Sequence, residues 1–220
     1  MQTYITMLVF DMDGTLFDTM GALNVVAQNV MHKHYGLAHE FGSELYKKTS
    51  GLPFRYQLEK IFPQNSANDV AAGEFEATKR EMYQKPVKPF PEVIEHLKLW
   101  KDWGYKIAVS SNDEEANVKI KMGEHVGLVD VLLGHRPGFL KGKAHFDELQ
   151  NSFGLAKNQM LFVGDSLHDG RMADENGIPF VGRLGTFSKD EFLALNIKCD
   201  LVKDFFELHG LLQHKYSLQK

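Results

Sequence analysis

An apolar segment that stops abruptly at two carboxylates constrains this chain more than any other stretch. Residues 7–10 (Met-Leu-Val-Phe) are long enough for a strand, and their unbroken apolar character is typical of a strand buried on both faces of a parallel sheet. Asp11 and Asp13 follow at the carboxyl end, which is the edge of an open α/β sheet where ligands bind. The sequence therefore predicts a parallel sheet with a polar site at the end of its first strand.

Asp11 and Asp13 point to the same side of an extended chain, because strand side chains repeat every second residue. Two carboxylates directed at one spot repel each other, so the pair needs a cation between them or a proton on one of them. Taken alone, the pair also fits an acidic turn with Asp caps. An EF-hand loop fits less well, because Gly14 comes too early and Ala22 stands where the bidentate Glu belongs.

Length and charge narrow the class of protein. The 220 residues suit one moderate domain, or a core with a smaller insert, and the net charge of −4 gives no reason to expect nucleic acid as a partner. The sequence shows neither the pattern of a secretory leader nor an apolar run long enough to span a membrane. We therefore predict a cytoplasmic protein without a membrane partner. The single cysteine, Cys199, excludes an internal disulfide and a thiolate zinc cluster, and we interpret it as a small apolar residue at the start of a strand.

The segment after Asp18 changes from strand to helix character. Apolar residues recur at helical spacing up to about residue 86, and no convincing strand pattern interrupts them. The prolines within residues 85–91 prevent helix continuation and indicate a return linker. The sequence therefore predicts a helical bundle at residues 19–86, inserted into a core made of residues 1–18 and 87–220.

From residue 92 onward, helix and strand patterns alternate. Apolar runs predict strands at residues 106–110, 131–133, 160–163, 180–181 and 200–202. Strands separated by helices at this rhythm predict βαβ units and a doubly wound parallel sheet.

Two of the loops that follow these strands could bind an anion. Residues 110–113 (Ser-Ser-Asn-Asp) would lie at the start of a helix, where free N–H groups favour negative charge, although they also fit a simple helix cap. Lys141 and Lys143 flank a glycine before the next helix, where a lysine can reach phosphate as a point charge. A solvated surface charge is the ordinary interpretation of such a lysine.

The loop at residues 164–170 gives a stronger signal. It directly follows an apolar strand, so Asp165 and Asp169 repeat the arrangement of Asp11 and Asp13 at the carboxyl edge of the sheet. Four carboxylates at one edge call for a hard divalent cation, and oxygen ligands with room for phosphate suit magnesium (Mg2+).

Together these motifs resemble those of the haloacid dehalogenase (HAD) superfamily, in its phosphohydrolase branch with a helical cap after the first strand. Residues 11–15 match the first family motif, Ser111 with Asn112 the second, a lysine the third, and residues 164–169 the fourth. For the second motif Ser110 is an alternative hydroxyl. For the third we prefer Lys141, but Lys143 stays open because the usual Lys-Pro is Lys-Gly here. The resemblance implies a Rossmann-like α/β core with an inserted helical cap.

The resemblance also implies roles for the site residues. Asp11 would attack phosphorus and form an aspartyl-phosphate, and Asp13 would act as general acid and base. Magnesium would be held by the side chains of Asp11 and Asp165 and by the main-chain carbonyl of Asp13, while Asp169 would orient a water molecule on the ion. Phosphate contacts are assigned to the following residues: Ser111, Asn112, and Lys141 or Lys143.

The implied activity is that of a magnesium-dependent phosphatase acting on a small phosphorylated metabolite, such as a sugar phosphate or a phosphoglycolate-like monoester. Asp13 favours phosphoryl transfer over dehalogenation, which has no use for that acid. Arg55, in a cap segment that resembles a substrate-contacting loop, could bind a second anionic group, or it could be a surface arginine. The alternatives are a β-phosphoglucomutase-like phosphomutase and a catalytically idle binding protein. For each of the three functions, we expect the protein to be a monomer or a homodimer.

Overall fold

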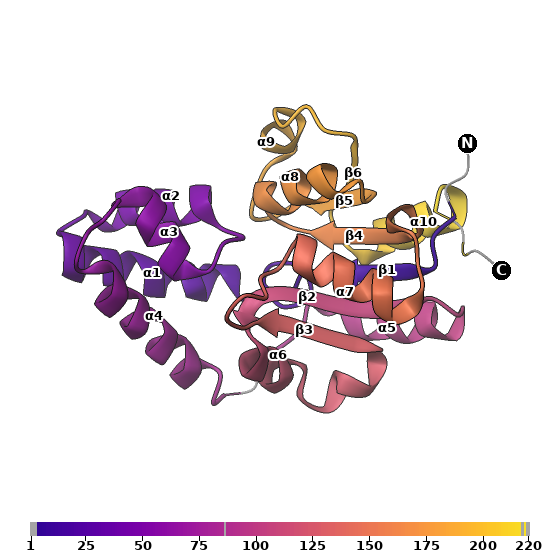
Figure 1. Ribbon diagram of the computed structural model, residues 1–220, viewed down its shortest axis with the longest axis horizontal. Helices are drawn as coiled ribbons and strands as arrows, with labels where there is room; N and C mark the ends of the chain where they lie inside the picture. The colour runs from indigo at the N-terminus through magenta and orange to yellow at the C-terminus, as the bar shows by residue number, and fades with distance from the viewer. Residues whose placement is uncertain (1–3, 86, 217, 219–220) are drawn as a thin grey trace. The chain divides into compact units, whose positions relative to one another are not determined.

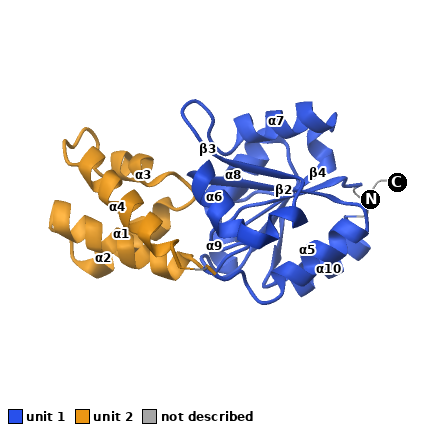
Figure 2. Ribbon diagram, turned by 90° about the horizontal axis from the view of Figure 1, so that it is seen from below, with its two compact units in different colours: residues 1–18, 88–220 blue, residues 19–87 orange. Residues whose placement is uncertain are grey.

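The computed structural model describes residues 4–85, 87–216 and 218 and divides into two compact units (Figure 2). The sheet unit comprises Met1–Asp18 and Lys88–Lys220, and the helical unit comprises Thr19–Val87. Pro86, which falls in the predicted linker, lies outside the described residues. The two units are described separately.

The sheet unit alternates strands and helices along the chain (Figure 1). Its strands are β1 (Met7–Phe10), β2 (Lys106–Glu114), β3 (Val131–His135), β4 (Met160–Gly164), β5 (Phe180–Arg183) and β6 (Cys199–Val202). Its helices are α5 (Val93–Asp102), α6 (Glu115–Met122), α7 (Lys143–Phe153), α8 (Leu167–Asn176), α9 (Lys189–Leu193) and α10 (Phe205–His214), with short 3-10 helices η1 (Gly123–Leu128) and η2 (Lys157–Gln159).

Within the described residues, the six strands form one parallel sheet in the order β3-β2-β1-β4-β5-β6. The first strand lies in the middle, with Val9 opposite Ala108 of β2 and Phe162 of β4. Parallel strands end at the same edge, so the residues that follow β1, β2 and β4 come together there. The predicted doubly wound α/β fold is confirmed.

Both faces of the sheet are covered, which explains the continuous apolar character of β1. Figure 2 shows α7 on one face and α5 and α10 on the other. Val9 belongs to the core cluster that includes Phe146 of α7, whereas Phe10 stacks on Trp100 of α5, with the ring centroids 5.9 Å apart. Because neighbouring side chains point to opposite faces, a strand between two helical layers has no position that tolerates a polar residue.

Polar character therefore begins where β1 leaves the covered region. The second strand behaves differently from the prediction: it was expected to end at Ser110, but it continues to Glu114. Its pairing with β3 shifts after Ser110 and resumes between Glu114 and His135, so the polar residues stay extended. The helix expected after this strand is also split, because the backbone turns at Gly123 (φ 47°) between α6 and η1.

The helical unit contains α1 (Met20–Tyr35), α2 (His39–Thr49), α3 (Phe54–Ile61) and α4 (Asn68–Met82). These helices enclose an apolar core of their own, in which Phe54 stacks on Phe75 at a centroid distance of 4.0 Å. Among the described residues of the whole chain, none of the helices combines the length and the apolar character that crossing a membrane requires.

Candidate active site

Asp11 occupies the first position after β1. Its backbone N–H donates to the carbonyl of Val163 in β4 (2.9 Å), so the residue is held in register with the sheet. The side chain is buried, and one carboxylate oxygen accepts a hydrogen bond from the Thr15 hydroxyl (3.3 Å). The strand end thus presents a buried carboxylate in a defined orientation.

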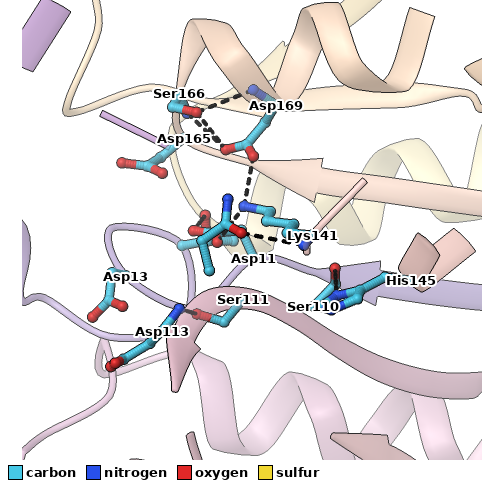
Figure 3. A network of polar contacts seen from close by, with 12 residues as sticks. Asp11, Asp13, Ser110, Ser111, Asp113, Lys141, His145, Asp165, Ser166 and Asp169 are labelled. Atoms are coloured by element: carbon cyan, nitrogen blue, oxygen red, sulfur yellow. Dashed lines mark hydrogen bonds and ion pairs between the residues drawn. The ribbon is translucent and has the colours of Figure 1, made fainter. Parts of the chain in front are cut away.

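Lys141 connects Asp11 with the loop after β4. Its ammonium lies 2.6 Å from Asp11 Oδ1 and 2.6 Å from Asp169 Oδ1, and its side chain is only 1% exposed. Figure 3 shows the lysine between the two carboxylates. A buried ammonium is stable only when it is paired and hydrogen-bonded, and here two carboxylates satisfy it.

Asp169 is held by the start of α8 as well as by Lys141. Its Oδ2 accepts hydrogen bonds from the hydroxyl (2.7 Å) and the backbone N–H (3.1 Å) of Ser166, while the Ser166 hydroxyl accepts from the Asp169 N–H (3.1 Å). This reciprocal capping box uses one carboxylate oxygen for the helix terminus. The other oxygen is left to face the site.

Burial and like charge shape the titration of these acids. Burial raises the pKa of Asp11 to about 6, even though Lys141 lowers it. Burial, with the charges of Asp11 and Asp169, raises the pKa of Asp165 well above its usual value. Burial lowers the pKa of Lys141, but the two carboxylates outweigh it and the pKa is raised. The cluster therefore favours additional positive charge.

Three carboxylates form a group that could hold a metal ion. One oxygen from each of Asp11, Asp165 and Asp169 lies within 4.8 Å of the others, and all three residues are buried. Asp165 also accepts a hydrogen bond from the hydroxyl of Thr186, in the loop after β5. The three carboxyl groups outnumber the one ammonium of Lys141, and carboxylate oxygens are hard ligands. These residues fit a divalent cation.

The polar end of β2 lies beside this cluster (Figure 3). Ser111 is buried, and its hydroxyl accepts from the backbone N–H of Asp113 (3.0 Å). The side-chain oxygen of Asn112 accepts from the backbone N–H of Lys141 (3.2 Å), which ties the second-strand motif to the lysine loop. The alternative hydroxyl, that of Ser110, shares a 2.8 Å hydrogen bond with His145 of α7.

The hydrogen bond between Ser110 and His145 can be tested by measuring stability at different pH values. Burial, together with the positive charge of Lys141, lowers the pKa of His145 to about 4. In the unfolded chain a histidine has a pKa near 6.5, so the unfolded state takes up this proton at a higher pH than the folded state does. The neutral ring therefore contributes fully to the free energy of unfolding above about pH 6.5, and that contribution is lost as the pH falls toward 4. Urea unfolding at pH 7 and pH 5 should show that His145 accounts for about 2 kcal/mol of the lost stability.

In His145→Gln, that part of the acid dependence should disappear. His125, which lies in η1, provides the matched control, since His125→Gln should leave the difference between pH 7 and pH 5 as it is in the wild type. Equal acid dependence in the wild type and His145→Gln would contradict the buried neutral ring.

The structure separates the two candidate lysines. Lys141 is in the site, whereas the Lys143 side chain is 76% exposed and pairs with Asp147 of its own helix. Gly142, between them, has φ 111°, a conformation that L side chains rarely adopt, and the chain turns there. Arg55, in the helical unit, pairs with Glu59 (2.9 Å) and with Asp69. Its proposed substrate contact stays a prediction.

The sequence does not single out every polar residue near the site, and the lysine that pairs with Asp13 is one that it leaves out. Asp13 does not lie in the three-acid group; its Oδ2 is 2.6 Å from the ammonium of Lys121, which also pairs with Asp113 (3.0 Å). Thr186 could have been found, because it follows a strand as the other site residues do. Nothing in the sequence distinguishes Lys121 from a lysine on a solvated helix face.

Comparisons with known proteins agree with this geometry. The family of haloacid dehalogenase-like hydrolases matches residues 8–183, a span that contains all four motifs and the helical unit. Probable phosphatase IndB of Dickeya dadantii (strain 3937) is 31% identical over 220 residues, covering 93% of this chain and 92% of the relative.

Phosphoglycolate phosphatase of Aquifex aeolicus (strain VF5) is 30% identical over 117 residues, which are 51% of this chain and 52% of the relative. The crystal structure of a predicted phosphatase from Clostridium acetobutylicum superimposes with a TM-score of 0.82 at 20% identity, covering 96% of this chain and 99% of the other, which shows the shared fold. The long family match and the full-length relative agree, and the chain therefore belongs to the haloacid dehalogenase-like hydrolase family.

Proposed function

We propose that this chain is a magnesium-dependent phosphatase that hydrolyses a small phosphomonoester through a covalent intermediate on Asp11. The observation that carries the proposal is the buried Asp11 carboxylate at the end of β1, paired with Lys141 inside a group of three acids. A nucleophile of this kind needs nearby positive charge to approach a phosphoryl group that is itself an anion.

The metal part of the proposal rests on the donor set. Asp11 and Asp165 would hold the ion directly, and Asp169, the third acid of the group, would orient a water molecule on it. The main-chain carbonyl of Asp13 would be a further ligand. Oxygen-only donors, with three carboxyl groups against the one ammonium of Lys141, favour a hard divalent cation such as magnesium. When bound, the ion would offset the repulsion between the Asp11 carboxylate and the phosphoryl oxygens.

In the first step, a carboxylate oxygen of Asp11 attacks phosphorus opposite the ester oxygen. The new Asp11 O–P bond forms as the P–O bond to the leaving alcohol breaks. Asp13 gives its proton to the departing oxygen, so the alcohol leaves neutral and Asp13 becomes a carboxylate. Lys141, 2.6 Å from Asp11, keeps the attacking group in place and faces the developing charge.

In the second step, a water molecule attacks the phosphorus of the aspartyl-phosphate and gives one proton to Asp13. The Asp11 O–P bond breaks, inorganic phosphate leaves, and both aspartates return to their starting states. Ser111 and the backbone around Asn112 are proposed to donate hydrogen bonds to phosphoryl oxygens in both steps, because they lie at the adjacent strand end.

The proposed substrate is a small phosphorylated metabolite, with phosphoglycolate and sugar phosphates as the first candidates. Support comes from two relatives whose names contain phosphatase, one of them phosphoglycolate phosphatase. The helical unit would act as a cap that selects the substrate, and the contribution of Arg55 to that selection stays a prediction.

Phosphate release from a panel of phosphorylated metabolites and one aryl phosphate tests the proposal. We expect release with magnesium and a fall to background with excess chelator, because three carboxylates then face the phosphoryl group without the ion. Adding magnesium back should restore activity. The absence of release from folded, magnesium-loaded protein across the panel would contradict the phosphatase assignment.

A further inference from the structure

A buried lysine on α6 lies against the proposed acid of the reaction. The Lys121 side chain has no exposure, and its ammonium lies 2.6 Å from Asp13 Oδ2 and 3.0 Å from Asp113 Oδ2. Lys121 has no part in the two reaction steps proposed for Asp11 and Asp13. A fully buried lysine is rare and costly unless it is paired, so its position requires an explanation.

Asp113 anchors this lysine. Its Oδ1 accepts hydrogen bonds from the backbone N–H of Glu114 and from the side chain of Asn117, both at 2.8 Å, while its Oδ2 faces Lys121. Asn117 and Lys121 are four residues apart on α6 and therefore lie on the same face of the helix. Asp113 is thus held from several directions and determines where the ammonium lies.

The helix itself has little freedom to shift. It begins at Glu115, directly after β2, and lies against Gly134 of β3, where an added Cβ would come within 2.3 Å of the Glu115 Cα. Only a residue without a side chain permits this approach. The ammonium is consequently a rigid point, whereas the Asp13 side chain, at 18% exposure, is the more accessible partner.

We propose that Lys121, anchored by Asp113, positions the carboxyl group of Asp13 for proton transfer to the leaving-group oxygen. Lys121 is thus a positioning residue that acts through Asp13. This inference rests on the proposed phosphatase function, because it assumes that Asp13 is the acid of the first step.

Substrates with different leaving groups distinguish a lysine that positions Asp13 from a lysine that only packs in the core. An aryl oxide leaves readily without a proton, whereas an alkoxide needs one, so loss of a well-placed acid harms alkyl substrates far more than aryl substrates. A lysine that only stabilised α6 would affect both substrates alike. The value of kcat/KM reports the step in which the leaving group departs.

The experiment measures kcat/KM with magnesium for p-nitrophenyl phosphate and for the alkyl phosphate that the wild type hydrolyses fastest. Lys121→Met should lower the alkyl value about 100-fold and the aryl value less than about 5-fold. Asp13→Asn should show the same selectivity with a larger alkyl loss. Lys119→Met is the matched control on the same helix: Lys119 is 60% exposed and pairs with Glu115, and its loss should change neither value.

If Lys121→Met does not fold, Asp113→Asn replaces it. This variant keeps the lysine but loosens its anchor, and it should show a smaller selective loss of about 10-fold. If the wild type is active and the variant loses activity equally on both substrates, or gains activity, the role of Lys121 is overturned while the proposed function stands. An inactive wild type would overturn the proposed function and this inference with it.

Discussion

Asp11→Asn is expected to lower kcat/KM for the best substrate by about 10,000-fold or more, which corresponds to about 5.5 kcal/mol of transition-state stabilisation. The amide matches the carboxylate in shape but lacks the charge and the nucleophilic oxygen. It also weakens one of the three donors that we assign to the metal. Steady-state phosphate release measures the loss, and mass spectrometry after brief incubation with substrate should detect phosphorylated wild type only.

The same variant should fold normally. Replacing Asp11 with a neutral residue removes one of three mutually repelling carboxylates, and Lys141 keeps its contact with Asp169 (2.6 Å). The matched control is Asp147→Asn, which breaks a surface ion pair and should leave activity unchanged. Activity above about 1% of the wild type in folded Asp11→Asn would mean that another group is the nucleophile.

Lys141→Met is expected to damage both stability and activity. Its ammonium contacts two buried carboxylates, so its removal leaves Asp11, Asp165 and Asp169 without their cation. Breaking a buried pair in this way costs about 3–5 kcal/mol, which would lower the Tm of the metal-free protein by about 10 °C. Activity should fall about 1,000-fold, because a charge that faces the transferring phosphoryl group is lost.

Magnesium should raise the Tm of Lys141→Met more than that of the wild type, since the ion replaces part of the missing positive charge. It should not restore activity. Lys143→Met is the matched control, because that lysine is two residues away, 76% exposed and paired with Asp147. We expect it to change stability by no more than about 0.5 kcal/mol. A larger activity loss in Lys143→Met than in Lys141→Met would contradict the assignment of the buried lysine.

The α/β fold could be predicted because its strands are buried on both faces. The stretch at residues 7–10 is apolar throughout, and the structure places helices on both faces of β1. The end of β2 could not be predicted in the same way. Ser111 and Asn112 are typical of a loop, but pairing resumes between Glu114 and His135, a contact that local composition does not encode.

The acids of the candidate site were visible in the sequence, because each follows an apolar run and parallel strands end at one edge. Asp11, Asp165 and Asp169 do come together there. The sequence favoured Lys141 over Lys143 for the third motif but could not exclude Lys143. Lys141 and Lys143 have the same chemistry and nearly the same position, and only the turn at Gly142 and the packing around it bury one and expose the other.

The sequence by itself determined the parallel α/β fold and the presence of acids directly after apolar strands, since both follow from the order of apolar and polar residues. Only the tertiary structure decided which charged side chains form ion pairs. Lys141 is 130 residues from Asp11, and Lys121 is 108 residues from Asp13. Ion pairing depends on distance and burial in the folded chain, and neither quantity is contained in the spacing of residues along the sequence.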